Sequence, residues 1–198
     1  MFCYQLCGML QKIIFQPGST YHVYNRSNGS EPMFRHAANY NHFLRKYNEY
    51  MSGLWDTHAY CLMPTHFHFL ITVKPNTKIE SEMSLRCSQA FSNLANSYTQ
   101  SFNKLHKRHG SLFTQNFRRK PVYDNEYLKT VICYIHNNPV KDGIAQVASD
   151  WQFSSYNELR MRNETLFGLH PVISLFGSRE SFIEHHLMNE TPENFRIV

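Results

Sequence analysis

The sequence lacks several patterns that mark large classes of protein. It contains no uninterrupted apolar run of about 18 residues, so no transmembrane helix is expected. The N-terminal stretch has no basic region before its apolar residues and no small-residue cleavage site after them, which argues against a secretory leader. We also find no internal repeat and no low-complexity segment. These absences favour a globular protein that works away from membranes.

Cysteine and net charge are also modest. The five cysteines are odd in number and form no C-x-x-C pair, which argues against a zinc ribbon or a disulfide framework and fits a reducing cytoplasm. A net charge of +5 is compatible with nucleic acid, and equally with an ordinary, slightly basic enzyme. Apolar residues, at 42%, are plentiful enough for a real core. The 198 residues suit one domain with an appendage.

The spacing of apolar residues predicts alternating strands and helices. Two-residue alternation is typical of strands, and spacings of three and four are typical of amphipathic helices. Pro139 is expected to end the third helix. The order β-α-β-β-α-β-α fits an α+β fold with a ferredoxin-like (split βαβ) antiparallel sheet and helices packed on one face. We expect strands at about 20–26, 54–63, 66–73 and 117–124, and helices at 36–51, 80–109, 125–138 and around 178–188.

The stretch "HFHFLITV" places His66 and His68 on one face of a strand, because residues two apart share a face. Phe67 and Phe69 then point to the opposite face. Two neutral imidazoles side by side can share a divalent metal, provided that a third ligand arrives from elsewhere in the fold. On its own, such a pair is more often plain polar surface.

The helix expected at 125–138 carries a second candidate group. Tyr134 and Asn138 are adjacent on it, one turn apart, at the edge of its apolar face. If that edge meets the histidine face, a phenol and an amide oxygen would join the two imidazoles. A phenol, with a pKa near 10, is a poor nucleophile, but a metal that polarises a phosphate can compensate. By spacing alone, ordinary packing of Tyr134 in the core is the simpler interpretation.

Three segments in order resemble one family. "CLMPTHFHFLI", "YIHNNPVKDG" and "WQFSSY" are similar to the REP-associated tyrosine transposases, within the single-tyrosine HUH transposase superfamily. "YHVYNRSN" resembles the first strand of that family, and "GSLFTQNFRRKPV" the segment before its catalytic helix. The likeness covers roughly residues 19–160. We therefore divide the chain into a lead segment (1–18), an HUH tyrosine transposase domain (19–160) and a helical extension of unknown role (161–198).

The resemblance implies a site and a reaction. It makes His66 and His68 ligands of Mg²⁺ or Mn²⁺, Tyr134 the nucleophile and Asn138 a third ligand, with the adjacent Asn137 leaving that last assignment weaker. Thr65 replaces the family's usual Asn, which removes a potential partner of a ligand but no ligand. The implied reaction cleaves single-stranded DNA at a hairpin through a 5′-phosphotyrosine and then rejoins it.

Other features of the implied protein stay open. It would be cytoplasmic and either a monomer or a homodimer, with the tyrosine supplied in cis or in trans. Two other functions also remain open at this point. The first is a non-cleaving protein that binds hairpin DNA, and the second is a metal phosphodiesterase that uses water.

Several basic residues are candidates for phosphate contacts, although only part of the 118–120 run can face DNA if that strand alternates. We regard His22 and His58 as structural and expect His185 and His186 at the surface. His136 lies about 200° around the helix from Tyr134, so it is not assigned to the metal. The candidates are Arg26, Lys104, Lys107, Arg108, Arg118, Arg119, Lys120 and Lys141.

Overall fold

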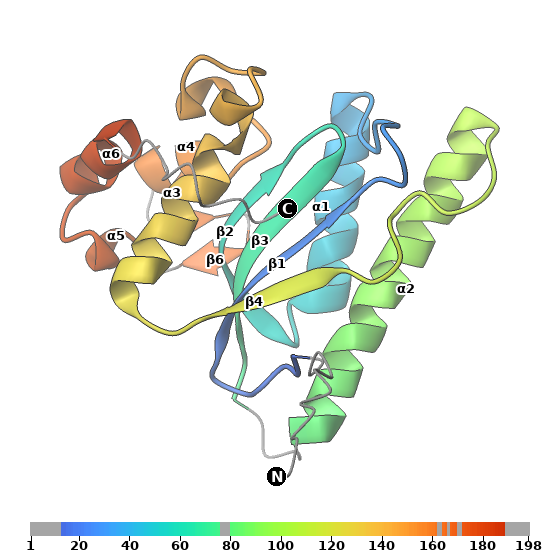
Figure 1. Cartoon of the computed structure of the whole chain (residues 1–198), viewed down its shortest axis with the longest axis horizontal. Coiled ribbons are helices and arrows are strands. Elements are labelled where there is room, and N and C mark those ends of the chain that lie inside the picture. Colours follow the sequence, from blue (N-terminus) through green and yellow to red (C-terminus); the bar gives the residue numbers. More distant parts are fainter. Residues whose placement is uncertain (1–12, 76–79, 162–163, 166, 170–171, 189–198) are drawn as a thin grey trace, which may run out of the picture.

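The computed structural model describes residues 13–75, 80–161, 164–165, 167–169 and 172–188 (Figure 1). The lead segment and the end of the extension lie largely outside these ranges. In chain order the main elements are β1 (Thr20–Arg26), α1 (Ala37–Met51), β2 (Trp55–Leu62), β3 (His66–Val73), α2 (Glu80–His106), β4 (Arg118–Val122) and α3 (Asn125–Lys141). After α3 the chain forms η1 (Ala148–Asp150), α4 (Tyr156–Met161), β5 (Glu164–Thr165), β6 (Gly168–Leu169), α5 (Val172–Leu175) and α6 (Arg179–Met188). No helix among the described residues is long and apolar enough to cross a membrane.

The first four strands form one sheet in the order β2-β3-β1-β4, with every neighbouring pair antiparallel. This order is the predicted ferredoxin-like layout. The two central strands, β3 and β1, carry the longest buried stretches, whereas β4 lies at an edge. Pro121 is tolerated there because an edge strand leaves alternate amides without a partner strand.

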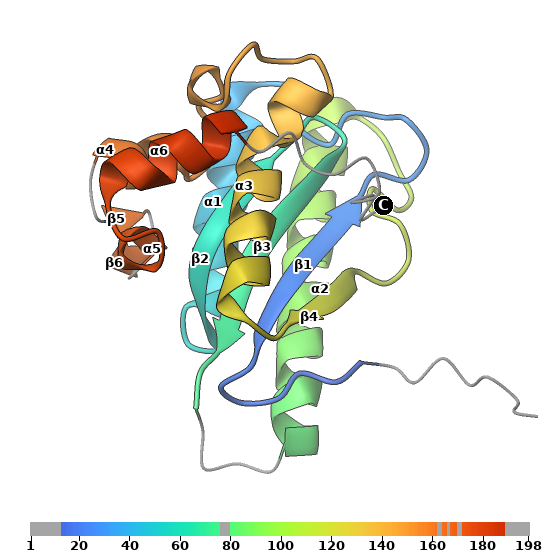
Figure 2. The same ribbon diagram turned by 60° about the vertical axis from the view of Figure 1, so that its left-hand side comes forward.

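One face of the sheet is covered by α1 and α2 (Figure 2). The strands send alternate apolar side chains to this face, among them Phe67 and Phe69. These rings meet Phe43 and Tyr47 of α1, and the Tyr47 ring stacks on Phe69 at 3.9 Å between centroids. Such a wide aromatic core fixes the register of β3, since a slip by one residue would turn these rings to the other face.

The opposite face carries α3, which lies mainly against β2 and β3 (Figure 2). On the far side of α3 pack η1 and, from the extension, α6. Residues all around the middle of α3 are therefore buried, from Val131 to His136 without a gap. A helix enclosed in this way is held by its neighbours more than by its own helix propensity.

The structure corrects two helix ends. α2 ends at His106, before the predicted 109, where Lys107 takes a left-handed backbone conformation (φ 50°). α3 continues through Pro139 and ends at Lys141, one turn beyond the predicted stop. Proline lacks the amide that would bond back to residue 135, which removes a single hydrogen bond in the last turn. The amides of Asp142 and Ile144 still bond to the carbonyls of Asn138 and Pro139, at 3.0 and 2.8 Å. The extra turn is what brings Lys141 to the level of the candidate site.

Candidate active site

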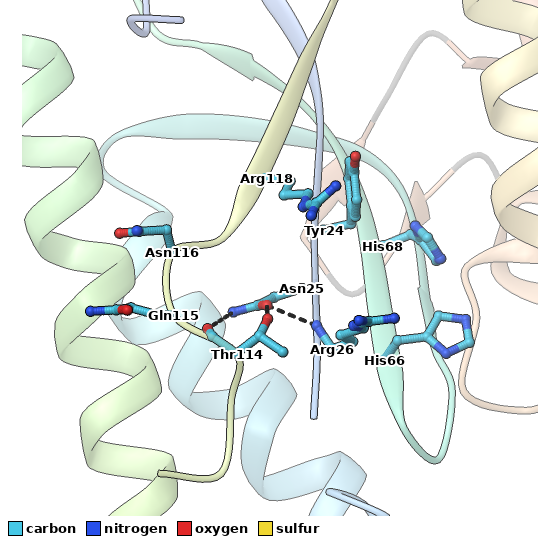
Figure 3. A pocket seen from close by; sticks show the side chains of 9 residues that line it. All are labelled: Tyr24, Asn25, Arg26, His66, His68, Thr114, Gln115, Asn116 and Arg118. Atoms are coloured by element: carbon cyan, nitrogen blue, oxygen red, sulfur yellow. Dashed lines mark hydrogen bonds between the residues drawn. The ribbon is translucent and has the colours of Figure 1, made fainter. Parts of the chain in front are cut away.

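The two histidines of β3 project from the face that α3 covers. His66 and His68 lie with their ring centroids 5.1 Å apart, at an interplanar angle of 83° (Figure 3). The side chain of His66 is 17% exposed, while His68 is fully buried. One imidazole therefore borders solvent and the other forms the floor of the site.

Tyr134 of α3 meets this pair within the same chain. Its ring lies edge-on to His68, with 5.6 Å between centroids and 83° between planes. Only 5% of the residue is exposed. Asp124 caps the helix by accepting the amide hydrogen of Tyr127 at 2.8 Å, which fixes where α3 begins and so which turn carries Tyr134.

Asn138 lies one turn further along α3 and is buried. Its amide nitrogen donates to the backbone carbonyl of Tyr134 at 2.7 Å. Its side chain is also close enough to His66 to raise the pKa of that imidazole. Asn138 is thus the carboxamide next to the histidine pair. The side chain of Asn137 instead donates to the carbonyl of His186 at 3.1 Å, away from the site.

Burial keeps both imidazoles neutral. It lowers the pKa of His66, against the opposing effects of the Asp142 carboxylate and the Asn138 hydrogen bond. The pKa of His68 falls well below its ordinary value, first through burial and then through the neighbouring His22, His66 and Lys141. Neutral imidazoles carry the free lone pair that a metal requires.

The donor atoms at this site fit a divalent metal ion that takes only a few ligands from the protein. The Nε2 atom of His68 is buried and has no hydrogen-bond partner among the described residues, which is unusual for a polar atom. Two imidazoles and the Asn138 oxygen make three neutral donors. The part of the chain that the structure describes contains no cluster of three His, Cys, Asp or Glu side chains that could hold an ion.

Lys141 lies over the ring of Tyr134, the candidate nucleophile. Its Nζ is 4.5 Å from the centroid of the Tyr134 ring. Burial lowers the pKa of this lysine, and the neighbouring Asp142 partly opposes the change. Asp142 Oδ2 also lies 3.9 Å from Nε2 of His66. The last residue of α3 therefore sets a cation over the phenol ring, and the residue after it sets a carboxylate near the outer histidine.

A cavity of about 170 Å³ opens beside the histidines, over β1 and β4 (Figure 3). Cross-strand pairing places Arg26 opposite His66, and Arg118 opposite Tyr24, which itself is opposite His68. Arg118 and Arg26 are exposed, and the guanidinium of Arg118 acts to lower the pKa of Tyr24, against the larger effect of burial. Lys120 follows on the same face of β4. Two guanidinium groups thus border the cavity next to the imidazoles.

The other basic candidates lie elsewhere. Arg119 points to the opposite face of the sheet, where its guanidinium lies 4.4 Å from the centroid of Phe15. Lys104, near the C-terminal end of α2, and Lys107, just after it, are exposed. α2 lies on the face of the sheet opposite α3 (Figure 2). Arg108, next to them, forms a 3.0 Å ion pair with Glu31.

His22 belongs to the site, although sequence reasoning regarded it as structural. Its Nε2 lies 2.9 Å from Nδ1 of His68, and both rings are buried. Burial, and then nearby Lys120, lower the pKa of His22 to about 3. The contact depends on the register of β1 against β3, with His22 diagonal to His68. The alternation of side chains along β1 could have predicted that His22 and Tyr24 share a face. It could not have predicted that His22 contacts His68.

The far side of α3 is tied to the extension by a second histidine pair. His136 faces away from the metal candidates, as predicted, whereas His186 is buried and its expected surface position is wrong. The Phe182 carbonyl can only accept, so Nδ1–H of His186 donates to it at 2.7 Å. His136 then donates from Nδ1 to Nε2 of His186, and Ser155 donates to Nε2 of His136, both at 2.8 Å. This chain of hydrogen bonds holds the catalytic-helix candidate from behind.

Comparisons with known proteins identify a family and a shared fold. Residues 17–138 match the family described as "Transposase IS200 like". A Haemophilus influenzae protein, provisionally named a REP-associated tyrosine transposase, is 27% identical over 105 residues, covering 52% of this chain and 60% of the relative's length. The structure of a REP-associated tyrosine transposase bound to a REP hairpin superposes with a TM-score of 0.57 at 17% identity, covering 74% of this chain and 82% of that one. At that identity the likeness shows a shared fold.

Proposed function

Because this chain belongs to the IS200-like transposase family, we propose that it cleaves and rejoins single-stranded DNA beside a hairpin, with Tyr134 as the nucleophile. One observation carries the proposal. The tyrosine of "YIHNNP" lies edge-on to the buried histidine of "HFH" within one chain. A tyrosine packed only for the core would need neither the neutral histidine pair nor the cation over its ring.

The proposed substrate is supported by a relative and by the charges of the sheet. The REP-associated transposase of similar fold is bound to a REP hairpin. Here α3 lies mainly on β2 and β3, so the β1–β4 half of that face stays more open. Arg26, Arg118 and Lys120 project from this half beside the cavity. We propose that an unpaired strand crosses it, with its phosphates against these cations.

His66, His68 and Asn138 are the proposed ligands of a divalent ion. Imidazole and carboxamide donors suit Mn²⁺ better than Mg²⁺, which prefers oxygen ligands and keeps several waters. When bound, such an ion polarises a phosphate and stabilises the charge that develops on it. The protein's own part is to keep both imidazoles neutral and to aim the Asn138 oxygen, whose amide is tied to the Tyr134 carbonyl.

The chemical step is a transesterification. The hydroxyl oxygen of Tyr134 forms a bond to phosphorus as the bond to the 3′ oxygen breaks. The phenol proton passes to water, and the departing 3′ oxygen takes one up. The products are a 5′-phosphotyrosine and a free 3′-hydroxyl. A 3′-hydroxyl from another strand can reverse the step, because the phosphodiester is conserved as a phosphotyrosine ester. Lys141 restrains the ring during the attack.

The test is a labelled, hairpin-flanked single strand incubated with the protein and Mn²⁺, followed by a denaturing gel. We expect a covalent protein–DNA band that Tyr134→Phe abolishes. Tyr127→Phe, two turns earlier on the same helix, is the matched control and keeps the band. Cleavage that survives Tyr134→Phe would contradict the proposal in favour of hydrolysis by water. Tight binding without any cleavage would instead indicate a hairpin-binding protein.

A further inference from the structure

The hydrogen bond between His22 and His68 raises a question of proton position. Each neutral imidazole has one nitrogen that donates and one that accepts. Two arrangements satisfy the 2.9 Å contact between His22 Nε2 and His68 Nδ1. If His68 donates, its Nε2 keeps a lone pair. If His22 donates, the proton of His68 sits on Nε2, and that atom cannot ligate a metal.

We infer that His22 is a positioning residue of the site, because its Nε2 accepts the Nδ1–H of His68 and so holds His68 in the tautomer with a free Nε2. Histidines that bind metals commonly donate their second nitrogen to a neighbouring acceptor, which orients the ring and strengthens the ligand. Backbone carbonyls and carboxylates are the usual acceptors. Here a second imidazole takes that place. The inference rests on the proposed metal-binding role of His68.

The surroundings of His22 support this role. Its ring is 1% exposed and stacks on Tyr24 with 5.0 Å between centroids. The Tyr134 ring lies edge-on to the His22 ring, with 6.0 Å between centroids, and Lys120 of β4 is paired with His22 across the sheet. Nδ1 of His22 has no partner among the described residues, so the contact with His68 is the hydrogen bond that orients this ring. A buried imidazole with one nitrogen unsatisfied is a poor core residue, which favours a role at the site.

The variants separate hydrogen bonding from packing. His22→Phe keeps an aromatic ring of similar size but offers no acceptor. His22→Gln can place an amide oxygen at about the same reach as Nε2. His58→Phe is the matched control, because that histidine hydrogen-bonds to Thr72 and lies on β2, which is not a neighbour of β1 in the sheet. Thermal unfolding of each variant confirms that it is folded.

The first readout is Mn²⁺ affinity, measured by electron paramagnetic resonance without DNA. We expect His22→Phe to weaken binding about 10- to 100-fold, His22→Gln to lie nearer to the unaltered protein, and His58→Phe to bind normally. Unchanged affinity in His22→Phe would overturn the inference. The inference would also be overturned if the unaltered protein bound no Mn²⁺.

The second readout is the ¹⁵N spectrum of the histidine rings with diamagnetic Zn²⁺ bound, which needs no variant. We expect His68 and His22 both to be protonated on Nδ1. A proton on Nε2 of His22 would overturn the inference. These results are independent of strand transfer: weakened Mn²⁺ binding in His22→Phe, without any Tyr134 adduct in the unaltered protein, would leave the role of His22 intact and remove the transferase. A Tyr134 adduct in the unaltered protein, together with unchanged Mn²⁺ affinity in His22→Phe, would instead support the transferase and overturn the role of His22.

Discussion

Replacing His186 by Phe tests how the extension holds α3. The ring volume is kept, so the cavity cost of a truncation is avoided. Nδ1–H of His136 loses its acceptor and stays buried. An unsatisfied buried donor costs about 1–3 kcal/mol. We therefore expect the free energy of unfolding near pH 7.5 to fall by about 1–3 kcal/mol.

The pH dependence of this variant gives a sharper signature. Burial lowers the pKa of His186 from 6.5 to about 4, against a weaker opposing effect of the Phe182 carbonyl. As the pH falls below 6.5 the unfolded chain takes up a proton that the folded protein resists, so stability is lost between pH 6.5 and about 4. At about 1.4 kcal/mol per pKa unit, the total is about 3 kcal/mol. His186→Phe lacks this loss.

The assay is urea unfolding at pH 7.5 and pH 5, monitored by circular dichroism. We expect the deficit of His186→Phe to be largest at pH 7.5 and to shrink or reverse at pH 5. His185→Phe on the same helix is the control, because that side chain hydrogen-bonds to the Ser181 carbonyl within α6. If His186→Phe unfolds with the same free energy and the same pH slope as the unaltered protein, the network does not hold α3 as argued.

Three further predictions concern the site and its helix. Lys141→Met should slow adduct formation about two- to fivefold in a single-turnover gel assay, since a cation over an aromatic ring contributes about 0.5–1 kcal/mol. Lys141→Arg should restore the rate. Equal rates for all three proteins would contradict a role of Lys141. Arg118→Gln should weaken DNA binding and lower its salt dependence, whereas Arg119→Gln, on the other face of the sheet, should not. The measurement is filter binding at several salt concentrations. Equal losses of affinity in the two variants would contradict the placement of DNA on one face of the sheet. Asp124→Ala should lower the free energy of unfolding by about 1 kcal/mol through loss of the helix cap, and urea titration would refute this if stability were unchanged.

Local patterns predicted much of the fold. The alternation of β1 and β3 and the helical spacing of α1 gave boundaries close to those observed, because burial on one face decides both register and helix phase. The end of α3 was predicted wrongly. Proline usually stops a helix, but here the carbonyls of its last turn find later amides. That single turn places Lys141 over Tyr134, a contact that spacing alone did not suggest.

The site was predictable in part, for a similar reason. His66 and His68 share a face by local geometry, and Tyr134 and Asn138 share a helix edge. The contact of His22 with His68 instead depends on the pairing of β1 with β3, 46 residues apart in sequence. The burial of His186 depends on how the extension folds back on α3. Contacts between distant segments are set by the whole fold and leave little local signal.

The central claim is that Tyr134 becomes covalently joined to the 5′ end of the cleaved strand. Its most direct test is mass spectrometry of the protein–DNA adduct after nuclease and protease digestion. We predict a nucleotide-bearing peptide with the added mass on Tyr134, linked through a 5′-phosphate. A nucleotide on Tyr24, the other tyrosine beside His68, or cleavage products without any modified peptide, would contradict the account.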